Sequence, residues 1–344
     1  MTTGIEFLEA SAVVLQGGLV EGVRTLLQPS TFVEQTINGL QRGFVLFLIA
    51  SGLTVILGIL DVLNLAHGEL YALGAFIASS VAGYMVGSSG LMEPPTSFDP
   101  VTSFAFIGVL VLVALVTAAI MLPIGAIVET TLIRPIYDRS EVYQLVLTFA
   151  ILLIIADAIE LIWGGQARSM GLDTKTAVND IPSFEFIGFG NIPTLVLMVM
   201  LVSLLVGAGL FWFFSRTKTG RIIRATAIDR EMATALGVSP DRTFTLVFAL
   251  GSFLAGFAGA MQFIQANAQP GMGENALVLS FVVIVVGGLG SLRGAIVGAL
   301  VVGVLENWMV VVEPQFQTAA PFAVMILVLL VKPDGLYGSW GERT

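Results

Sequence analysis

The sequence predicts an all-α polytopic membrane protein with eight or nine transmembrane helices, and three observations support this prediction. Of the 344 residues, 56% are apolar and only 11% are charged, with a mean hydropathy of +0.94; ordinary soluble domains are about 25% charged. Long apolar runs such as 43–60, 143–163 and 195–214 approach or reach the roughly 20 residues that a helix needs to cross a bilayer. The runs are continuously apolar, whereas the strands of a membrane barrel alternate polar and apolar residues.

One transmembrane domain accounts for most of the chain. We expect an N-terminal extension over 1–32, irregular or with an amphipathic helix over 5–27. The transmembrane domain is expected over 33–338 and a cytoplasmic tail over 339–344. The predicted spans are 42–60, 66–86, 104–129, 143–163, 192–214, 243–264, 276–290, 294–312 and 317–332. The glycine-rich stretch 287–294 either separates two of these spans or kinks a single helix, so the count is eight or nine.

The positions of the basic residues predict which loops face the cytoplasm, because loops rich in lysine and arginine stay on that side of the membrane. Arg134 and Arg139 place the 130–142 loop inside, and the basic tail is placed inside as well. The 87–100 loop carries acids and no cation, so we place it outside. The 164–191 loop is long and rich in proline, glycine and acids, which also fits an external loop.

Polar residues interrupt the apolar pattern within 51–78. Asp61, Asn64, His67 and Glu69 lie inside or beside predicted helices, among several glycines. An ionisable group in the middle of a bilayer costs about 2.5–3.5 kcal/mol on insertion scales, so it normally faces protein or water. Either this segment bends and lines a path for a polar solute, with Asn64, His67 and Glu69 as pathway residues, or it is a short cytoplasmic turn.

A second interruption covers 285–303 and contains glycines at a four-residue spacing. We interpret Gly290, Gly294 and Gly298 as one helix face that packs closely against a neighbouring helix. Arg293 either anchors a helix end at the cytoplasmic interface or faces a pathway.

The two interruptions, 52–74 and 287–303, lie in the first and last thirds of the chain. Paired interruptions of this kind are typical of transporters built from inverted repeats, with the solute path at their centre. The pair therefore indicates a transport function more than an enzymatic one.

No motif for catalysis, metal or cofactor binding occurs in the sequence. The chain has no cysteine and one histidine, His67, so neither a thiolate nor a multi-histidine metal site is possible. It contains no phosphate-binding loop of the form G-x-x-x-x-G-K-[ST], which excludes nucleotide hydrolysis by that route. A net charge of −9 argues against nucleic acid as a partner. We expect a non-catalytic protein without cofactors.

The segment 216–242 is the stretch least compatible with lipid. It carries six of the fifteen basic residues and lies between two apolar runs. Its cations can simply fix the orientation of the protein. Within it, Glu231–Gly237 has the spacing E-x-A-x-x-x-G, which predicts a short helix that ends with Gly237 as its C′ residue. The residues that we expect to contact a cytoplasmic partner are Arg224, Asp229, Glu231, Ala233 and Gly237.

Three segments together resemble one family. The E-x-A-x-x-x-G segment is similar to the coupling motif of ABC importer permeases, E-A-A-x-x-x-G, with Met232 in place of an alanine. The stretch GILDVLNLAHGELYALGAF resembles the first signature of permeases from the branched-chain amino-acid ABC uptake family. Residues 286–306 and the later LLVKPDGLYG resemble the C-terminal signature of that family. The resemblance covers residues 33–338 in the expected order.

The resemblance implies a subunit of the cytoplasmic (inner) membrane of a prokaryote. Its implied partners are a second, homologous permease, two cytoplasmic ATPases that hydrolyse ATP, an external solute-binding protein and membrane lipid. The implied mechanism is alternating access, driven through the 224–237 segment. Urea permeases share the same signatures, so a urea or short-amide solute is an alternative to branched-chain amino acids. A secondary transporter or a channel, neither of which needs ATPases, is the alternative from another class.

Overall fold

The computed structural model describes residues 18–88, 100–170, 184–186 and 190–338, so the predicted tail at 339–344 lies outside the described residues. The predicted all-α membrane fold is confirmed. The helices are α2 (Pro29–Leu60), α3 (His67–Ala82), α4 (Pro100–Val128), α5 (Glu141–Trp163), α7 (Thr194–Arg216), α8 (Lys218–Ile228), α9 (Arg230–Ala235), α10 (Pro240–Gln265), α11 (Met272–Gly287), α12 (Leu292–Val312) and α13 (Ala320–Val331). The strands β1 (Phe184–Phe186) and β2 (Gly190–Ile192) form a small antiparallel hairpin.

Six helices of the described part are long and apolar enough to cross a membrane: α2, α4 with the turns that extend it to Ile136, α5, α7, α10 and α12. Two predicted full spans are shorter than expected: α11 has 16 residues and α13 has 12. At 1.5 Å per residue, a 16-residue helix covers about 24 Å, less than the roughly 30 Å of hydrocarbon. α3 has 16 residues as an α-helix, but a π-helical stretch, Gly83–Ser88, continues it over the predicted span.

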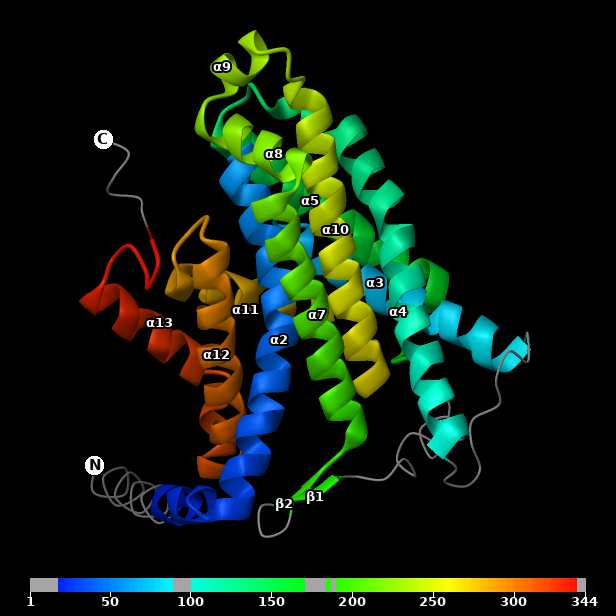
Figure 1. Ribbon diagram of the computed structural model, residues 1–344, viewed down its shortest axis with the longest axis vertical. Helices are drawn as coiled ribbons and strands as arrows, with labels where there is room; N and C mark the ends of the chain where they lie inside the picture. The colour runs from blue at the N-terminus through cyan, green and yellow to red at the C-terminus, as the bar shows by residue number, and fades with distance from the viewer. Residues whose placement is uncertain (1–17, 89–99, 171–183, 187–189, 339–344) are drawn as a thin grey trace, which may run out of the picture.

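α2 lies in the middle of the bundle, between α12 on one side and α7 and α10 on the other (Figure 1). Most of its side chains from Val45 to Ile56 are buried. Its contact with α12 is made by glycines: a Cβ atom on Gly303 would clash with the backbone of Gly43. Small residues let helix backbones approach closely, which is how helices gain packing energy where lipid supplies no hydrophobic driving force.

The predicted glycine face of the last third needs a correction. Gly290 is not helical: it lies in the turn 288–291 with a φ of 76°. The helix α12 begins only at Leu292, capped by the Ser291 hydroxyl, which accepts from the Gly294 N–H at 3.1 Å. Gly294 and Gly298 lie against α11, beside Gly287 and Val283. The turn also shows that 287–294 separates two helices.

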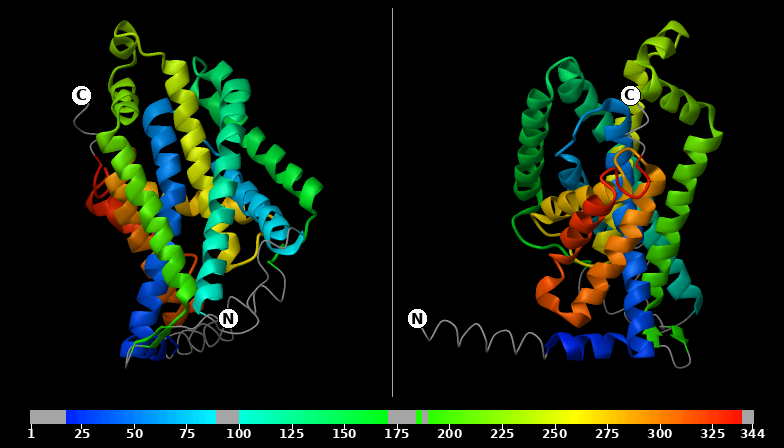
Figure 2. Two further views of the ribbon diagram at one scale, coloured as in Figure 1. Left: turned by 45° about the vertical axis from the view of Figure 1, so that its right-hand side comes forward. Right: turned by 90° about the vertical axis from the view of Figure 1, so that its left-hand side faces the viewer.

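The N-terminal part joins the bundle earlier than expected. Residues 18–26 are helical and lie across the end of α12, where Gly22 touches the backbone of Val312 (Figure 2). α2 begins at Pro29, so the expected boundary between 32 and 33 falls inside this helix. The rest of the expected 5–27 helix, residues 5–17, lies outside the described residues.

The two ends of the bundle differ in charge. The basic segments 130–142 and 216–242 lie at the same end, since Arg134 contacts the first turn of α10. α8 and α9 stand at this end, and the β hairpin and the start of α2 lie at the other (Figure 1). This arrangement matches the predicted orientation, with the α8–α9 end in the cytoplasm.

Candidate functional site

The first interruption starts near the cytoplasmic end of α2 and returns into the bundle. α2 ends at Leu60, and Asp61 takes a left-handed conformation with a φ of 55°. Residues 61–66 then run back along α2, so that the His67 ring lies 3.0 Å from the Ile49 carbonyl oxygen. Leu60 lies eleven positions after Ile49, which is about 16 Å of helix. α3 therefore begins inside the bundle and not at its surface.

The second break repeats this plan in the opposite direction. α10 lies antiparallel to α2, since Gln41 pairs with Gln265 at 2.9 Å and Gly52 packs on Gly251. An irregular segment, 266–271, follows α10 just as 61–66 follows α2, and α11 then begins as a short helix. The counterpart of the first interruption is thus 266–271, and not 287–303 as the sequence suggested. Inverted breaks that meet at the bundle centre are the architecture of many transporters.

The N-terminal ends of the two short helices meet. Gly68 and Gly273 are the second residues of α3 and α11, and each is followed by a glutamate, Glu69 or Glu274. A Cβ atom on Gly68 would clash with the carbonyl oxygen of Gly273, so glycine is needed for this contact. Glutamates in a first helical turn face the positive end of the helix dipole, which stabilises them there.

The three predicted pathway residues lie at this centre, and all three are buried. The Asn64 side chain accepts a hydrogen bond from the Ala66 N–H at 3.1 Å, and His67 bonds to α2. Glu69 lies against Gly273 of α11. Within the described residues, Asn64 Nδ2 and His67 Nδ1 have no hydrogen-bond partner. The contacts of Asn64 and His67 hold the irregular segment in place.

A cavity of about 310 Å³ lies beside the break, in the half of the bundle away from α8 and α9. Side chains from α2, α3, α10 and α11 line it, together with the segment after α10. The lining residues are Arg42, Val45, Leu46, Ile49, Tyr71, Gln262, Ala266, Asn267, Gln269, Met272, Asn275 and Ala276. One wall is polar and carries a charge, and the other is aliphatic.

Arg42 supplies the charge of the polar wall, and Glu306, which pairs with it, lies behind the lining residues. Arg42 of α2 donates to Glu306 of α12 at 3.4 Å and to the Gln262 amide oxygen at 3.2 Å. Sequence reasoning missed this pair, because its members are 264 positions apart. The available signal was the presence of one acid and one base in otherwise apolar runs, since such residues face protein or water and tend to pair.

Comparison with known proteins identifies the family. Residues 35–329 match the family described as the permease component of branched-chain amino acid transport systems. The chain belongs to this family. It is therefore a multi-pass membrane protein and the permease subunit of an ABC importer.

Three relatives show the extent of the similarity. The permease is 29% identical over 311 residues to BraD of the high-affinity branched-chain amino acid transport system of Pseudomonas aeruginosa, covering 89% of this chain and 96% of the relative. It is 28% identical over 312 residues to LivH of Escherichia coli K12, with the same coverage. The ribose import permease RbsC of Escherichia coli K12 is 25% identical over 319 residues, covering 89% of this chain and 88% of the relative. No solved structure matches the chain.

The predicted coupling helix of the permease is α9, at the outermost tip of the cytoplasmic end (Figure 1). The Asp229 carboxylate accepts from the Met232 N–H at 2.8 Å and caps its start. The predicted end at Gly237 is confirmed: its φ is 86°, and the Val238 N–H reaches back to the Ala233 carbonyl. These bonds form a Schellman motif, which closes the last turn of a helix.

The surface of α9 is exposed and partly apolar. Glu231, Met232 and Leu236 are exposed, and so is Ile228 just before it, whereas Ala233 is buried. Exposed apolar side chains at the tip of a cytoplasmic helix are suited to a protein partner. Arg224, the remaining predicted contact residue, lies on α8 and lines a second cavity instead.

Aromatic contacts link α9 to the membrane helices. The Arg230 guanidinium lies 5.0 Å from the centre of the Phe244 ring in the second turn of α10. The Phe244 ring meets Tyr137 edge to face at 5.3 Å. A cation over an aromatic face contributes about 0.5–1 kcal/mol at an exposed site. These contacts connect α9 to the start of α10.

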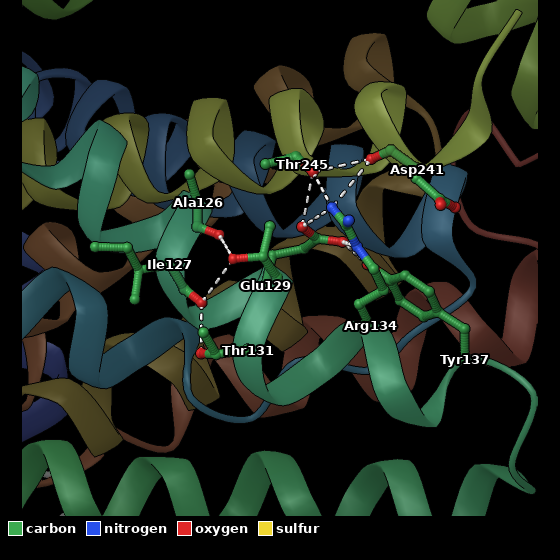
Figure 3. A network of polar contacts seen from close by, with 9 residues as sticks. Ala126, Ile127, Glu129, Thr131, Arg134, Tyr137, Asp241 and Thr245 are labelled. Carbon is green, nitrogen blue, oxygen red and sulfur yellow. Dashed lines mark hydrogen bonds and ion pairs between the residues drawn. The ribbon is translucent and has the colours of Figure 1, made fainter.

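Beneath this contact, a polar network joins the end of α4 to α10 (Figure 3). Glu129 is fully buried and is bonded by Arg134 at 2.9 Å and by the Thr245 hydroxyl at 2.8 Å. The Tyr137 hydroxyl donates to the same carboxylate at 2.9 Å. Burial and the neighbouring carboxylate raise the pKa of the Tyr137 phenol, so it stays protonated and can donate. No sequence pattern indicated this network.

We predict that Arg134→Gln destabilises the permease more than the double change Arg134→Gln with Glu129→Gln. The single change leaves a buried carboxylate without its cation, which costs several kcal/mol, about 3–5 in fully buried pairs. Because Arg134 is about one-third exposed, we expect the lower part of this range or less.

The melting temperature of the detergent-solubilised permease measures this difference. Arg139→Gln, an exposed arginine in the same loop, is the control and should leave the melting temperature unchanged. A double variant less stable than Arg134→Gln would show that the carboxylate does not depend on Arg134.

Proposed function

We propose that this permease moves branched-chain amino acids inward, and that the cavity beside the central break holds the amino acid. The observation that carries this proposal is the division of the cavity into a charged wall and an aliphatic wall. Small-molecule sites combine apolar walls with a few fixed polar groups in this way. At about 310 Å³, the cavity is at the lower end of their size range, which suits a single amino acid.

The chemistry of the two walls fits a zwitterion with an apolar side chain. The Arg42 guanidinium can accept the carboxylate of the solute, and Glu306 can accept its ammonium group. Val45, Leu46 and Ile49 then face the hydrocarbon side chain. When the amino acid binds, Arg42 and Glu306 each exchange the other for an oppositely charged group of the solute. Neither buried charge is then left without a counter-charge.

Urea, the alternative that the sequence left open, fits the cavity less well. It is uncharged and has no hydrocarbon part, so neither the ion pair nor the aliphatic wall would serve it. The names of BraD and LivH point to branched-chain amino acids, and that of RbsC to ribose, a sugar without charge. The ion pair favours the amino acid over both.

The proposed energy source is a pair of cytoplasmic ATPases, which dock on α9 through Asp229, Glu231 and Gly237. The predicted contact at Ala233 is wrong, because this side chain is buried. An external binding protein delivers the solute, and a second, homologous permease completes the pathway. α10 offers the mechanical connection: Phe244 near its start touches Arg230, and Gln262 near its end lines the cavity. A helix of 26 residues carries a displacement over about 39 Å. A secondary transporter or channel would need no such tip helix.

Asn64, His67 and Glu69 complete the proposed pathway as the residues that shape it. Their contacts fix the break from which α3 starts, next to Tyr71 in the cavity wall. We therefore propose that they position the pathway and that Arg42, Glu306 and Gln262 contact the solute.

We predict that Arg42→Gln, Glu306→Gln and the double variant all lose leucine uptake by the complete importer. Each lost charged contact is worth about 1.5–3 kcal/mol, or roughly 10–100-fold in affinity. Uptake of radiolabelled leucine into proteoliposomes, with excess unlabelled urea or ribose as competitor, measures this. Arg139→Gln is the control, and neither competitor should reduce uptake.

The double variant separates a binding role from a structural one. If the pair only stabilises the fold, removing both charges at once should restore uptake. Restored uptake in the double variant would therefore contradict the proposed site. Uptake that urea suppresses would identify the alternative solute.

For the coupling helix, we predict that Glu231→Lys and Gly237→Val uncouple the permease from its ATPases, whereas Gly237→Asn does not. A β-branched residue in the left-handed region costs roughly 1–2 kcal/mol and distorts the end of α9, but asparagine tolerates this conformation. Copurification of the ATPases and solute-stimulated ATP hydrolysis are the measurements. Glu160→Lys, at the far end of α5, controls for the charge reversal. Unchanged copurification with Glu231→Lys and Gly237→Val would place the docking surface elsewhere.

A further inference from the structure

A second cavity, of about 400 Å³, lies near the cytoplasmic end of the bundle and plays no part in the proposed solute path. It is enclosed by the last turns of α2 and α7, one face of α8 and the turn before α12. Its lining residues are Thr54, Val55, Gly58, Ile59, Phe211, Phe214, Ser215, Arg224, Ala227, Ile228, Gly290, Ser291, Leu292 and Arg293. They come from four segments that are far apart in the sequence.

Two arginines line this cavity. Arg224 projects from α8 and Arg293 from the first turn of α12. Neither makes an ion pair or a side-chain hydrogen bond within the part of the chain that the structure describes, whereas Arg42 and Arg134 each do both. Both side chains are exposed. In a protein with a net charge of −9, two cations that line one cavity favour an anionic ligand from outside the chain.

The remaining lining is strongly apolar. Val55 and Ile59 of α2 face Phe211 and Phe214 of α7 across the cavity, and Leu292 adds to the same surface. These residues belong to the last two turns of α2 and α7, where membrane-spanning helices leave the hydrocarbon. A ligand that fits this cavity has a negatively charged group and an apolar part. It lies at the depth of the lipid headgroups of the cytoplasmic leaflet.

We propose that this cavity binds an anionic phospholipid of the cytoplasmic leaflet. The phosphate lies between Arg224 and Arg293, and an acyl chain runs down the apolar wall towards Val55 and Phe211. Basic pockets between transmembrane helices on the cytoplasmic side recognise such headgroups. Arg293 thus anchors the start of α12 through a lipid, and Arg224 serves the membrane instead of the ATPase.

The location favours a lipid over an acidic side chain of a partner protein. α9 extends beyond α8 and the helix ends, so a cytoplasmic partner meets α9 first (Figures 1 and 2). The cavity lies below that tip, at the ends of the membrane helices. The carboxylate side chain of a partner protein would leave the aromatic and aliphatic wall uncovered, whereas an acyl chain would bury it.

The test measures lipid retained by the complete importer. The complex is incorporated into vesicles of equal phosphatidylcholine and phosphatidylglycerol, extracted in detergent and purified, and the lipids in the purified sample are quantified by mass spectrometry. We expect phosphatidylglycerol to be enriched. Arg224→Gln with Arg293→Gln should lower that enrichment on the order of tenfold. Arg139→Gln, an exposed cytoplasmic arginine outside the cavity, should leave it unchanged.

A second variant tests the apolar half while keeping both charges. Ala227→Phe fills the cavity from α8 and should also abolish the enrichment. Inorganic phosphate in the wash should displace little phosphatidylglycerol, because it lacks the acyl chain; full displacement would identify a free phosphate site and overturn the lipid. Enrichment that survives both variants would overturn the proposal. If the double arginine variant lost the ATPase subunits from the purified complex but kept its lipid, the arginines would contact a protein partner, and the proposal would also be overturned.

Discussion

A backbone that leaves the helical conformation in the middle of a membrane must be covered by protein, and this constraint organises the whole permease. Unpaired backbone groups cost several kcal/mol in hydrocarbon, so irregular segments are tolerated only where other helices bury them or water reaches them. The segments 61–66 and 266–271 meet this condition because Gly68 and Gly273 let the starts of α3 and α11 touch. α2, α10, α4 and α12 pack around that contact and keep lipid away from it.

The two helix breaks place polar groups inside the bundle, at positions that a continuous helix would not reach. The segment after α10 contributes Asn267 and Gln269 to the same cavity as Arg42, while α2 contributes the aliphatic wall. The cavity and the α9 tip lie at opposite halves of the bundle, and α10 runs between them. One helix thus touches the proposed site of the solute, the Glu129 network and the aromatic contact of the coupling helix.

The sequence predicted features that depend on local or continuous patterns. Apolar runs gave the long helices, and the spacing to Gly237 gave the end of α9, because a C′ glycine acts within one turn. The polar cluster at Asn64, His67 and Glu69 was located, but its geometry was not, since a surface turn and a buried break share the same residue types. Arg42 and Glu306 pair across 264 positions, and only the assembled fold brings them together. Gly290 was misassigned because its spacing fits a helix, although the turn before α12 requires its positive φ.

The buried break is the central claim, and the absence of cysteine from the chain makes it directly measurable. The variants Ala66→Cys and Arg139→Cys are each treated with a membrane-impermeant maleimide in inside-out vesicles. Ala66 is fully buried, while Arg139 lies in an exposed cytoplasmic turn. We expect rapid labelling at position 139 and none at position 66 until the protein is unfolded. Equal labelling of the two positions would show that residues 61–66 form a surface turn, and would contradict the account.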